Sequence, residues 1–195
     1  MRAFVVWLAV ILSGLAIGVV SGAYVALAGK APVQKIDGWE LSALAGSKLA
    51  DPYTRAAVSR VGLLALTRQE TLYFNRFSDD EGRPLQEGCD YRLDGQDLPA
   101  RWWSVTLYAE DNYLAVNGDK AASFDATRQR ASGQGGWSVF VGDKPKSGAP
   151  WISNRGGGKF SLTLRLYNPA AAAASSPATL ALPHLVRLGC RSEGA

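Results

Sequence analysis

Consecutive basic and aromatic residues near the middle of the chain are the first candidates for ligand binding. Arg101, Trp102 and Trp103 open a stretch in which apolar and polar residues alternate. Because side chains alternate between the two faces of a β-strand, the two indoles are expected on opposite faces. Trp103 shares its face with Val105 and Leu107, which predicts a position in the core. Trp102 then points away from the core, where it either lines a site for a sugar or a partner or covers a helix or the sheet edge.

A second alternating strand supplies further candidates. From Phe160 to Leu166 every second residue is apolar, whereas Arg165 and Tyr167 lie on the opposite, polar face. A guanidinium and phenols beside an indole could hold a carbohydrate or a small organic acid. The predicted ligand-binding site therefore combines residues of the two strands, namely Arg101, Trp102, Tyr108, Arg165 and Tyr167.

The residue inventory argues against the familiar catalytic sites. His184 is the only histidine, which excludes a zinc site with two histidines, and no serine lies in a G-x-S-x-G motif. The glycine-rich segment 155–159 differs from a phosphate-binding loop, because Ser153 stands where glycine is required and Phe160 where serine or threonine is required. We therefore predict no catalytic residue, no metal site and no cofactor, and interpret His184 as a structural residue.

The charge of the chain argues against a nucleic-acid partner. The chain has 21 basic and 17 acidic residues, and two of the bases, Arg2 and Lys30, flank an apolar segment. Without them, residues 31–195 carry a net charge of only +2, whereas nucleic-acid binding needs a clustered basic face. The acidic run 79–81 and the basic residues of 144–159 are interpreted as solvated turns and loops.

The N-terminal segment predicts a membrane anchor. No charged residue lies between Arg2 and Lys30, and residues 3–28 are almost wholly apolar, which is longer than the roughly 20 residues that a transmembrane helix needs. A cleavable signal peptide is the alternative, because residues 26–28 read Ala-Leu-Ala, but the apolar run exceeds an ordinary signal peptide. We favour an uncleaved anchor in the inner membrane, with a single pass and the following domain in the periplasm.

Turn residues and the change of period divide the chain into three parts. Residues 1–30 are the anchor or signal segment, residues 31–84 a tether, a helix and the first strand, and residues 85–195 a β-sandwich domain. Asp51 and Pro52 predict the start of a helix that continues to about residue 67. From residue 71 onward the apolar residues recur at every second position, which is typical of strands. The predicted strands are 71–77, 89–93, 102–108, 113–116, 137–142, 159–167 and 184–188. Residues 170–177 are interpreted as a surface connection.

The two cysteines predict a disulfide. Cys89 and Cys190 are the only cysteines, and both follow the apolar segment. In an oxidising compartment, pairing is the expected fate of two thiols, whereas two separate buried thiols are the alternative. The bond would join the last strand to the beginning of the sandwich.

Three segments, in this order along the chain, resemble a known bacterial family. Residues 99–108 read PARWWSVTLY, residues 111–117 read DNYLAVN and residues 160–169 read FSLTLRLYNP. Over roughly residues 85–188 the chain is similar to the family named domain of unknown function 1214. The resemblance implies an antiparallel β-sandwich of jelly-roll type and a partner that carries the sister domain of unknown function 1254. It implies no catalytic residues. The predicted fold is therefore mainly β, with one N-terminal membrane-spanning helix and one or two short helices before the sandwich.

Two functions remain compatible with the sequence. The first is a membrane-anchored module of the cell envelope that binds a ligand or a partner. The second is an envelope enzyme, a hydrolase or lyase for a carbohydrate or a small organic acid, with Arg101, Tyr108, Arg165 and Tyr167 around a cleft. A deep polar pocket that joins these side chains would favour the enzyme, and a flat apolar face would favour the binding module.

Overall fold

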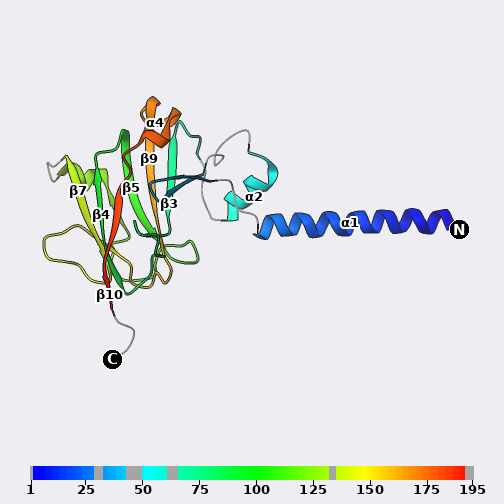
Figure 1. The fold of residues 1–195 in the computed structure, drawn as a ribbon, viewed down its shortest axis with the longest axis horizontal. Helices are drawn as coiled ribbons and strands as arrows, with labels where there is room; N and C mark the ends of the chain where they lie inside the picture. The colour runs from blue at the N-terminus through cyan, green and yellow to red at the C-terminus, as the bar shows by residue number, and fades with distance from the viewer. Residues whose placement is uncertain (1, 29–32, 43–49, 61–65, 132–134, 192–195) are drawn as a thin grey trace. The chain divides into compact units, whose positions relative to one another are not determined.

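A computed structural model describes residues 2–28, 33–42, 50–60, 66–131 and 135–191 of the chain (Figure 1). The chain divides into two compact units. The first comprises residues 1–32 and 44–65, and the second comprises residues 33–43 and 66–195. The described helices α1 and α2 belong to the first unit, and the described strands belong to the second.

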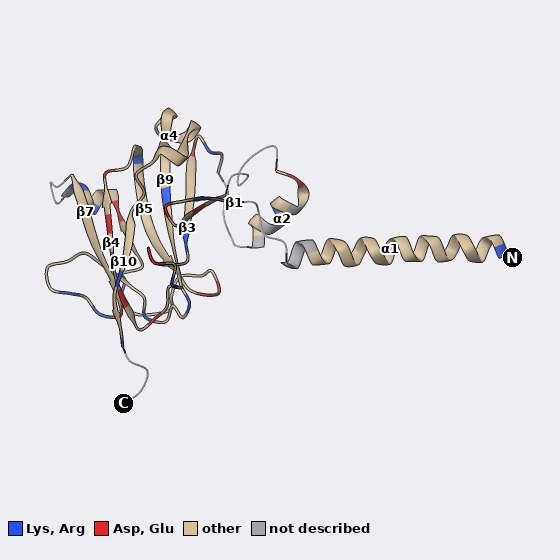
Figure 2. Ribbon diagram, viewed as in Figure 1, with Lys and Arg blue, Asp and Glu red and all other residues tan. Residues whose placement is uncertain are grey.

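The first unit contains the apolar helix that the sequence predicts. Helix α1 spans Arg2–Ala28, and its stretch Arg2–Tyr24 has a mean hydropathy of 2.6. Figure 2 shows charge only at the start of this helix. It is long and apolar enough to cross a membrane.

Helix α2, Pro52–Arg60, begins where the sequence predicts. The carboxylate of Asp51 accepts a hydrogen bond from the backbone N–H of Thr54 at 3.1 Å, which satisfies one of the free donors at the helix start. The helix was expected to continue to residue 67. Residues 61–65 lie outside the described part of the chain, and residues 66–67 are not helical.

Two sheets form the second unit. Their strand orders are β1-β2-β3-β9-β5-β6 and β10-β4-β7-β8. In the six-stranded sheet the strands are β1 (Val33–Ile36), β2 (Trp39–Ser42), β3 (Thr71–Arg76), β5 (Ala100–Tyr108), β6 (Ser123–Asp125) and β9 (Ser161–Pro169). In the four-stranded sheet they are β4 (Cys89–Gln96), β7 (Gly136–Gly142), β8 (Trp151–Ser153) and β10 (His184–Cys190). Short helices α3 (Ala126–Ala131), α4 (Ala171–Ser175) and η1 (Pro177–Thr179) complete the described elements.

The mainly β fold with two sheets is confirmed. Neighbouring strands are antiparallel, except that β7 and β8 run parallel, which differs from the wholly antiparallel prediction. The jelly-roll type of connection stays a prediction.

The core lies between the inward faces of the two sheets. Trp103 of β5 is completely buried, and its ring stacks on that of Trp137 of β7, with 4.8 Å between ring centroids. Leu162, Leu164 and Leu166 of β9 are also completely buried. The predicted core face of both alternating strands is therefore confirmed.

Three segments differ from their predicted structure. Residues 33–36 were expected in a tether but form β1, because Asp37 and Gly38 make a tight hairpin turn with φ values of 47° and 78°. Residues 113–116 were expected as a strand, yet they form an irregular loop after Asn112, whose φ is 66°. Residues 171–175, expected in a surface connection, form α4, which buries Ala173.

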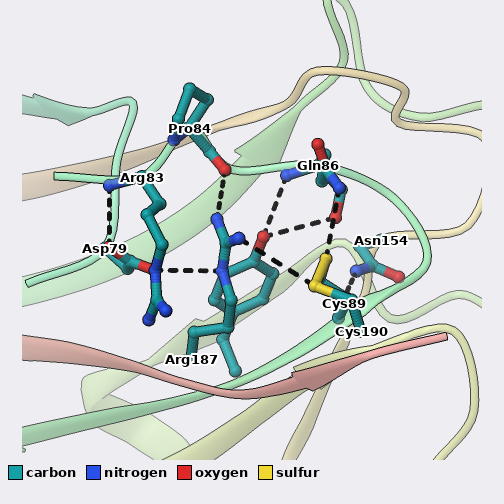
Figure 3. Close-up of a disulfide and its surroundings, with 9 residues drawn as sticks. Asp79, Arg83, Pro84, Gln86, Cys89, Asn154, Arg187 and Cys190 are labelled. Carbon is teal, nitrogen blue, oxygen red and sulfur yellow. Dashed lines mark hydrogen bonds and ion pairs between the residues drawn. A yellow bond between two sulfur atoms is a disulfide. The ribbon is translucent and has the colours of Figure 1, made fainter. Parts of the chain in front are cut away.

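The disulfide between Cys89 and Cys190 is present, as the sequence predicts (Figure 3). The two cysteines face each other at the end of the β4–β10 ladder. The Asn154 side chain donates a hydrogen bond to the carbonyl of Cys89 at 2.8 Å, and that of Gln86 contacts the Cys89 sulfur at 3.4 Å. The bond therefore fixes the C-terminal strand to the edge of β4.

An ion-pair network lies beside this disulfide, where the sequence suggested only a solvated turn (Figure 3). Asp79 is buried, and its carboxylate lies 2.9 Å from Nε of Arg83 and 3.0 Å from Nε of Arg187. Burial acts to raise the pKa of Asp79, but hydrogen bonds from Arg83 and the charges of Arg187 and Arg83 outweigh it and lower the pKa. Asp79 is thus an ionised structural residue.

Candidate functional site

The outward side of the six-stranded sheet gathers most of the predicted site residues. Trp102 of β5 pairs with Tyr167 of β9, and Arg165 of β9 pairs with Tyr73 of β3 on its other side. Tyr108 lies six residues after Trp102 and therefore on the same face of β5. We call these five residues, Tyr73, Trp102, Tyr108, Arg165 and Tyr167, the polar face.

Arg165 lies at the centre of the polar face. Its Nη2 donates a hydrogen bond to the hydroxyl of Tyr108 at 2.7 Å. Its guanidinium carbon lies 5.2 Å from the centre of the Tyr108 ring and 5.9 Å from that of Tyr73, so two aromatic rings flank the charge. The described residues place no carboxylate within ion-pair distance of Arg165. Its Nε and Nη1 have no protein hydrogen-bond partner there, and neither is sealed from solvent.

An aromatic pair lies beside the arginine. The rings of Trp102 and Tyr167 are 5.4 Å apart and tilted by 47°, and both side chains are half-buried. The indole N–H of Trp102 donates to the hydroxyl of Thr127 at 3.0 Å, which fixes its orientation. Burial raises the pKa of Tyr167, although the charge of Arg165 partly offsets this, so its hydroxyl stays protonated at neutral pH.

Small polar side chains surround these rings. Thr163 donates to the Asn75 side chain at 2.7 Å. Thr71, opposite Tyr167, is buried, and its hydroxyl has no hydrogen-bond partner among the described residues. Two acids lie on the same face: Glu40 of β2, which is 3.5 Å from Nζ of Lys35, and Asp125 of β6, which accepts the backbone N–H groups of residues 127 and 128. The carboxylate of Asp125 is therefore engaged by the backbone at the start of α3.

Arg101 does not join the polar face. Strand alternation places it opposite to Trp102, and its side chain is exposed. The structure therefore does not bring Arg101 together with the other four predicted residues, and its role in ligand binding stays a prediction. Conversely, sequence reasoning missed Tyr73, although its place in the predicted strand 71–77 could have indicated it.

A separate pocket of about 420 Å³ is lined by residues of the four-stranded sheet, including Gln96 and Trp137, by Leu182 before β10 and by Asp37 in the turn between β1 and β2. His184 lies at its border, exposed, with Nδ1 3.5 Å from a carboxylate oxygen of Asp80. No polar-face residue lines it. Within the described ranges, histidine, cysteine and acidic side chains form no group of three that could hold a metal ion.

The basic residues of 144–159 do not converge on a site. Arg155 pairs with Asp119, and Lys146 lies 3.7 Å from a carboxylate oxygen of Asp90. Figure 2 shows acidic and basic segments interspersed over the sheets. The polar face is therefore the stronger candidate for recognition.

Two solved structures are similar to this chain, and the first of them shares its fold. The VPA0106 protein from Vibrio parahaemolyticus is 21% identical with a TM-score of 0.55, over 73% of this chain and 36% of that chain. An uncharacterized protein from Burkholderia cenocepacia is 15% identical with a TM-score of 0.46, over 61% of this chain and 30% of that chain. The chain thus spans about a third of the length of these proteins. Proteins with curated functions give no match.

A family model agrees with the motifs in the two alternating strands. The model described as "Protein of unknown function (DUF1214)" matches residues 70–171. This range covers just over half of the chain and includes β3, β5 and β9, the strands that carry the polar face. The chain therefore belongs to the DUF1214 family.

Proposed function

We propose that this protein is a ligand-binding module of the bacterial cell envelope, held in the inner membrane by α1, with its sheets in the periplasm. The observation that carries the proposal is the polar face. There, the buried ring of Tyr73 and the half-buried ring of Tyr108 flank an arginine that has no carboxylate partner among the described residues. Because Arg165 is half-buried, its guanidinium loses part of its hydration, and a bound anion would compensate this loss.

Two features support the location. Helix α1 has the length and composition of a membrane span. The disulfide between Cys89 and Cys190 favours an oxidising compartment, since thiols of cytoplasmic proteins are normally kept reduced. Both features agree with a short cytoplasmic N-terminus and an exported domain.

The proposal includes a protein partner. The chain corresponds to only 36% of the VPA0106 protein, so that longer relative carries further sequence in the same polypeptide. A separate protein carrying the sister domain of unknown function 1254 would supply a comparable second part here. Co-purification of that protein with the full chain from membranes is the corresponding test.

The location predicts the behaviour of reporter fusions. Alkaline phosphatase, which folds only outside the cytoplasm, should be active when it is fused after Ala195, whereas green fluorescent protein exported in the unfolded state should be dark there. The reason is that one span with an internal N-terminus exports everything after it. Fluorescence together with inactive phosphatase would contradict the proposed topology.

The binding role predicts thermal stabilisation by a small ligand. The full chain in detergent is heated with D-galacturonate, D-galactose, citrate or phosphate, each supplied in turn. A ligand at about ten times its Kd should raise Tm by roughly 3–6 °C, because it stabilises only the folded state.

Two tryptophan variants make this measurement specific. Trp102→Ala should lose the ligand-induced shift. Trp151→Ala should retain the shift, because Trp151 lies in the other sheet. It is a matched control, since Trp151 is also half-buried and its indole also donates one hydrogen bond, to the carbonyl of Gly142. No shift with any compound, or equal shifts in both variants, would contradict ligand binding at the polar face.

A further inference from the structure

We infer that the ligand of the polar face is a sugar acid, whose carboxylate binds Arg165 and whose ring packs on Trp102 and Tyr167. This inference rests on the proposed binding function and adds the chemical class of the ligand. The same chemistry occurs in a free uronic acid and in a uronic acid unit of a polysaccharide.

The free donors of Arg165 fit a carboxylate. A guanidinium has five N–H groups, and two pairs of them point in parallel, one from Nε and Nη2 and one from Nη1 and Nη2. Tyr108 accepts only one hydrogen of Nη2. Whichever hydrogen this is, the other pair stays intact, and such a pair matches the two oxygens of a carboxylate.

The surroundings of Arg165 hold the guanidinium in place without neutralising it. The centres of the Tyr73 and Tyr108 rings lie 5.9 and 5.2 Å from its guanidinium carbon, and neither ring carries a charge that would compete with an anion. Asp125 of β6, which is two strands away from β9, is engaged by the first N–H groups of α3, and its carboxylate lies 4.0 Å from Nε of Arg128. An arriving carboxylate therefore meets a positioned cation.

The aromatic pair lies at the right spacing for a sugar ring. Arg165 and Tyr167 are two residues apart on one face of β9, a separation of about 7 Å along the strand. This is comparable to the distance from the carboxylate of a uronic acid to the far side of its ring. Trp102, directly opposite Tyr167, widens this aromatic surface, and the apolar C–H face of a pyranose packs against such rings.

Hydroxyl and amide groups around the rings favour a ligand with many hydroxyls. Asn75 and Thr106 are half-buried on the same face. The hydroxyls of a sugar can exchange hydrogen bonds with these two side chains, whereas a purely apolar acid cannot.

Titration calorimetry of the full chain in detergent tests the inference. The probes are D-galacturonate, a galacturonate trisaccharide and neutral D-galactose. We expect one or both acids to bind, and galactose to bind at least about tenfold more weakly, since it lacks the group that forms charge-assisted hydrogen bonds. Stronger binding of the trisaccharide would identify a polysaccharide as the source, and equal binding would identify the free acid.

Three variants locate the carboxylate. Arg165→Gln should weaken binding of the acid by about 10- to 100-fold, which corresponds to the loss of hydrogen bonds to a charged group. Arg165→Lys keeps the charge but lacks the parallel donors, so binding should also fall. The control Arg92→Gln removes an exposed arginine that pairs with Asp94 on the other sheet, and should bind as the wild type does.

The outcomes separate this inference from the proposed function. Binding of galactose as tight as that of the acids, binding of citrate or phosphate alone, or acid binding that both Arg165 variants leave unchanged would overturn the sugar-acid assignment. Citrate or phosphate binding that depends on Trp102 would still support the binding module. If Arg165→Gln fails to fold, judged by its circular dichroism, Arg165→Lys decides the result.

Discussion

Replacing Trp103 by alanine should lower the free energy of unfolding by about 3–5 kcal/mol, the usual cost of emptying a buried aromatic site. Trp103 is completely buried, and its ring stacks on Trp137 and contacts Phe124 with centroids 5.9 Å apart. Its removal therefore opens a cavity at the junction of the two sheets. Denaturant unfolding of the full chain in detergent, followed by near-ultraviolet circular dichroism, measures the loss.

The neighbouring residue gives a matched control. Trp102→Ala removes the same side chain from the same strand, but Trp102 is half-buried on the polar face. Its loss should therefore reduce stability much less than the loss of Trp103. Equal losses, or a larger loss for Trp102→Ala, would contradict the assignment of the two faces of β5.

This assignment was predictable because it depends on local geometry. Alternation along β5 and β9 requires only a period of two, and it places Trp103 and the leucines of β9 in the core without knowledge of which strands are neighbours. The same rule applied strictly would have kept Arg101 off the polar face. The family resemblance added only the jelly-roll type of the sandwich, which stays a prediction.

Pairing between strands was not predictable in this way. Arg165 contacts Tyr108 and Tyr73 because β9 lies between β5 and β3, strands that are distant from it in sequence. The alternation of apolar and polar residues within one strand does not indicate which other strands pair with it. The sequence therefore indicated most residues of the polar face, whereas the arrangement of rings around the guanidinium required the sheet order.

Short elements were missed for a different reason. Strands β6 and β8 each have three residues, too few to display a period. Asp37-Gly38 was a readable hairpin signal, but its flanking strands have only four residues each. The ion pairs of Asp79 combine residues from distant segments, and the local run of acids resembled a solvated turn.

Loss of the disulfide should reduce stability by up to about 4.7 kcal/mol, the loop-closure term for a bridge across roughly 100 residues. Cys89 and Cys190 are separated by 101 positions, and their bond fixes β10 beside β4. Without it, the C-terminal strand is held by its ladder and by the ion pair of Arg187 with Asp79. A loss of this size is a large share of the 5–15 kcal/mol that is typical of a domain.

Unfolding with and without a reducing agent measures this effect. The wild-type chain should lose stability on reduction, whereas the double variant Cys89→Ala/Cys190→Ala should be equally unstable in both conditions. Thiol labelling of denatured, unreduced protein from membranes should find no free thiol. Two free thiols per chain would contradict the disulfide in the cell and would also weaken the periplasmic location.

The two single variants separate the cross-link from the packing of its sulfur atoms. Both lose the bond, but Cys89 is buried within the core cluster, whereas Cys190 is exposed at the end of β10. Cys89→Ala therefore removes packed sulfur in addition to the cross-link and should cost about 1 kcal/mol more than Cys190→Ala. If the two variants lose equal stability, loop closure alone accounts for the effect. If Cys190→Ala loses more, the C-terminal strand is packed differently at this end of the ladder.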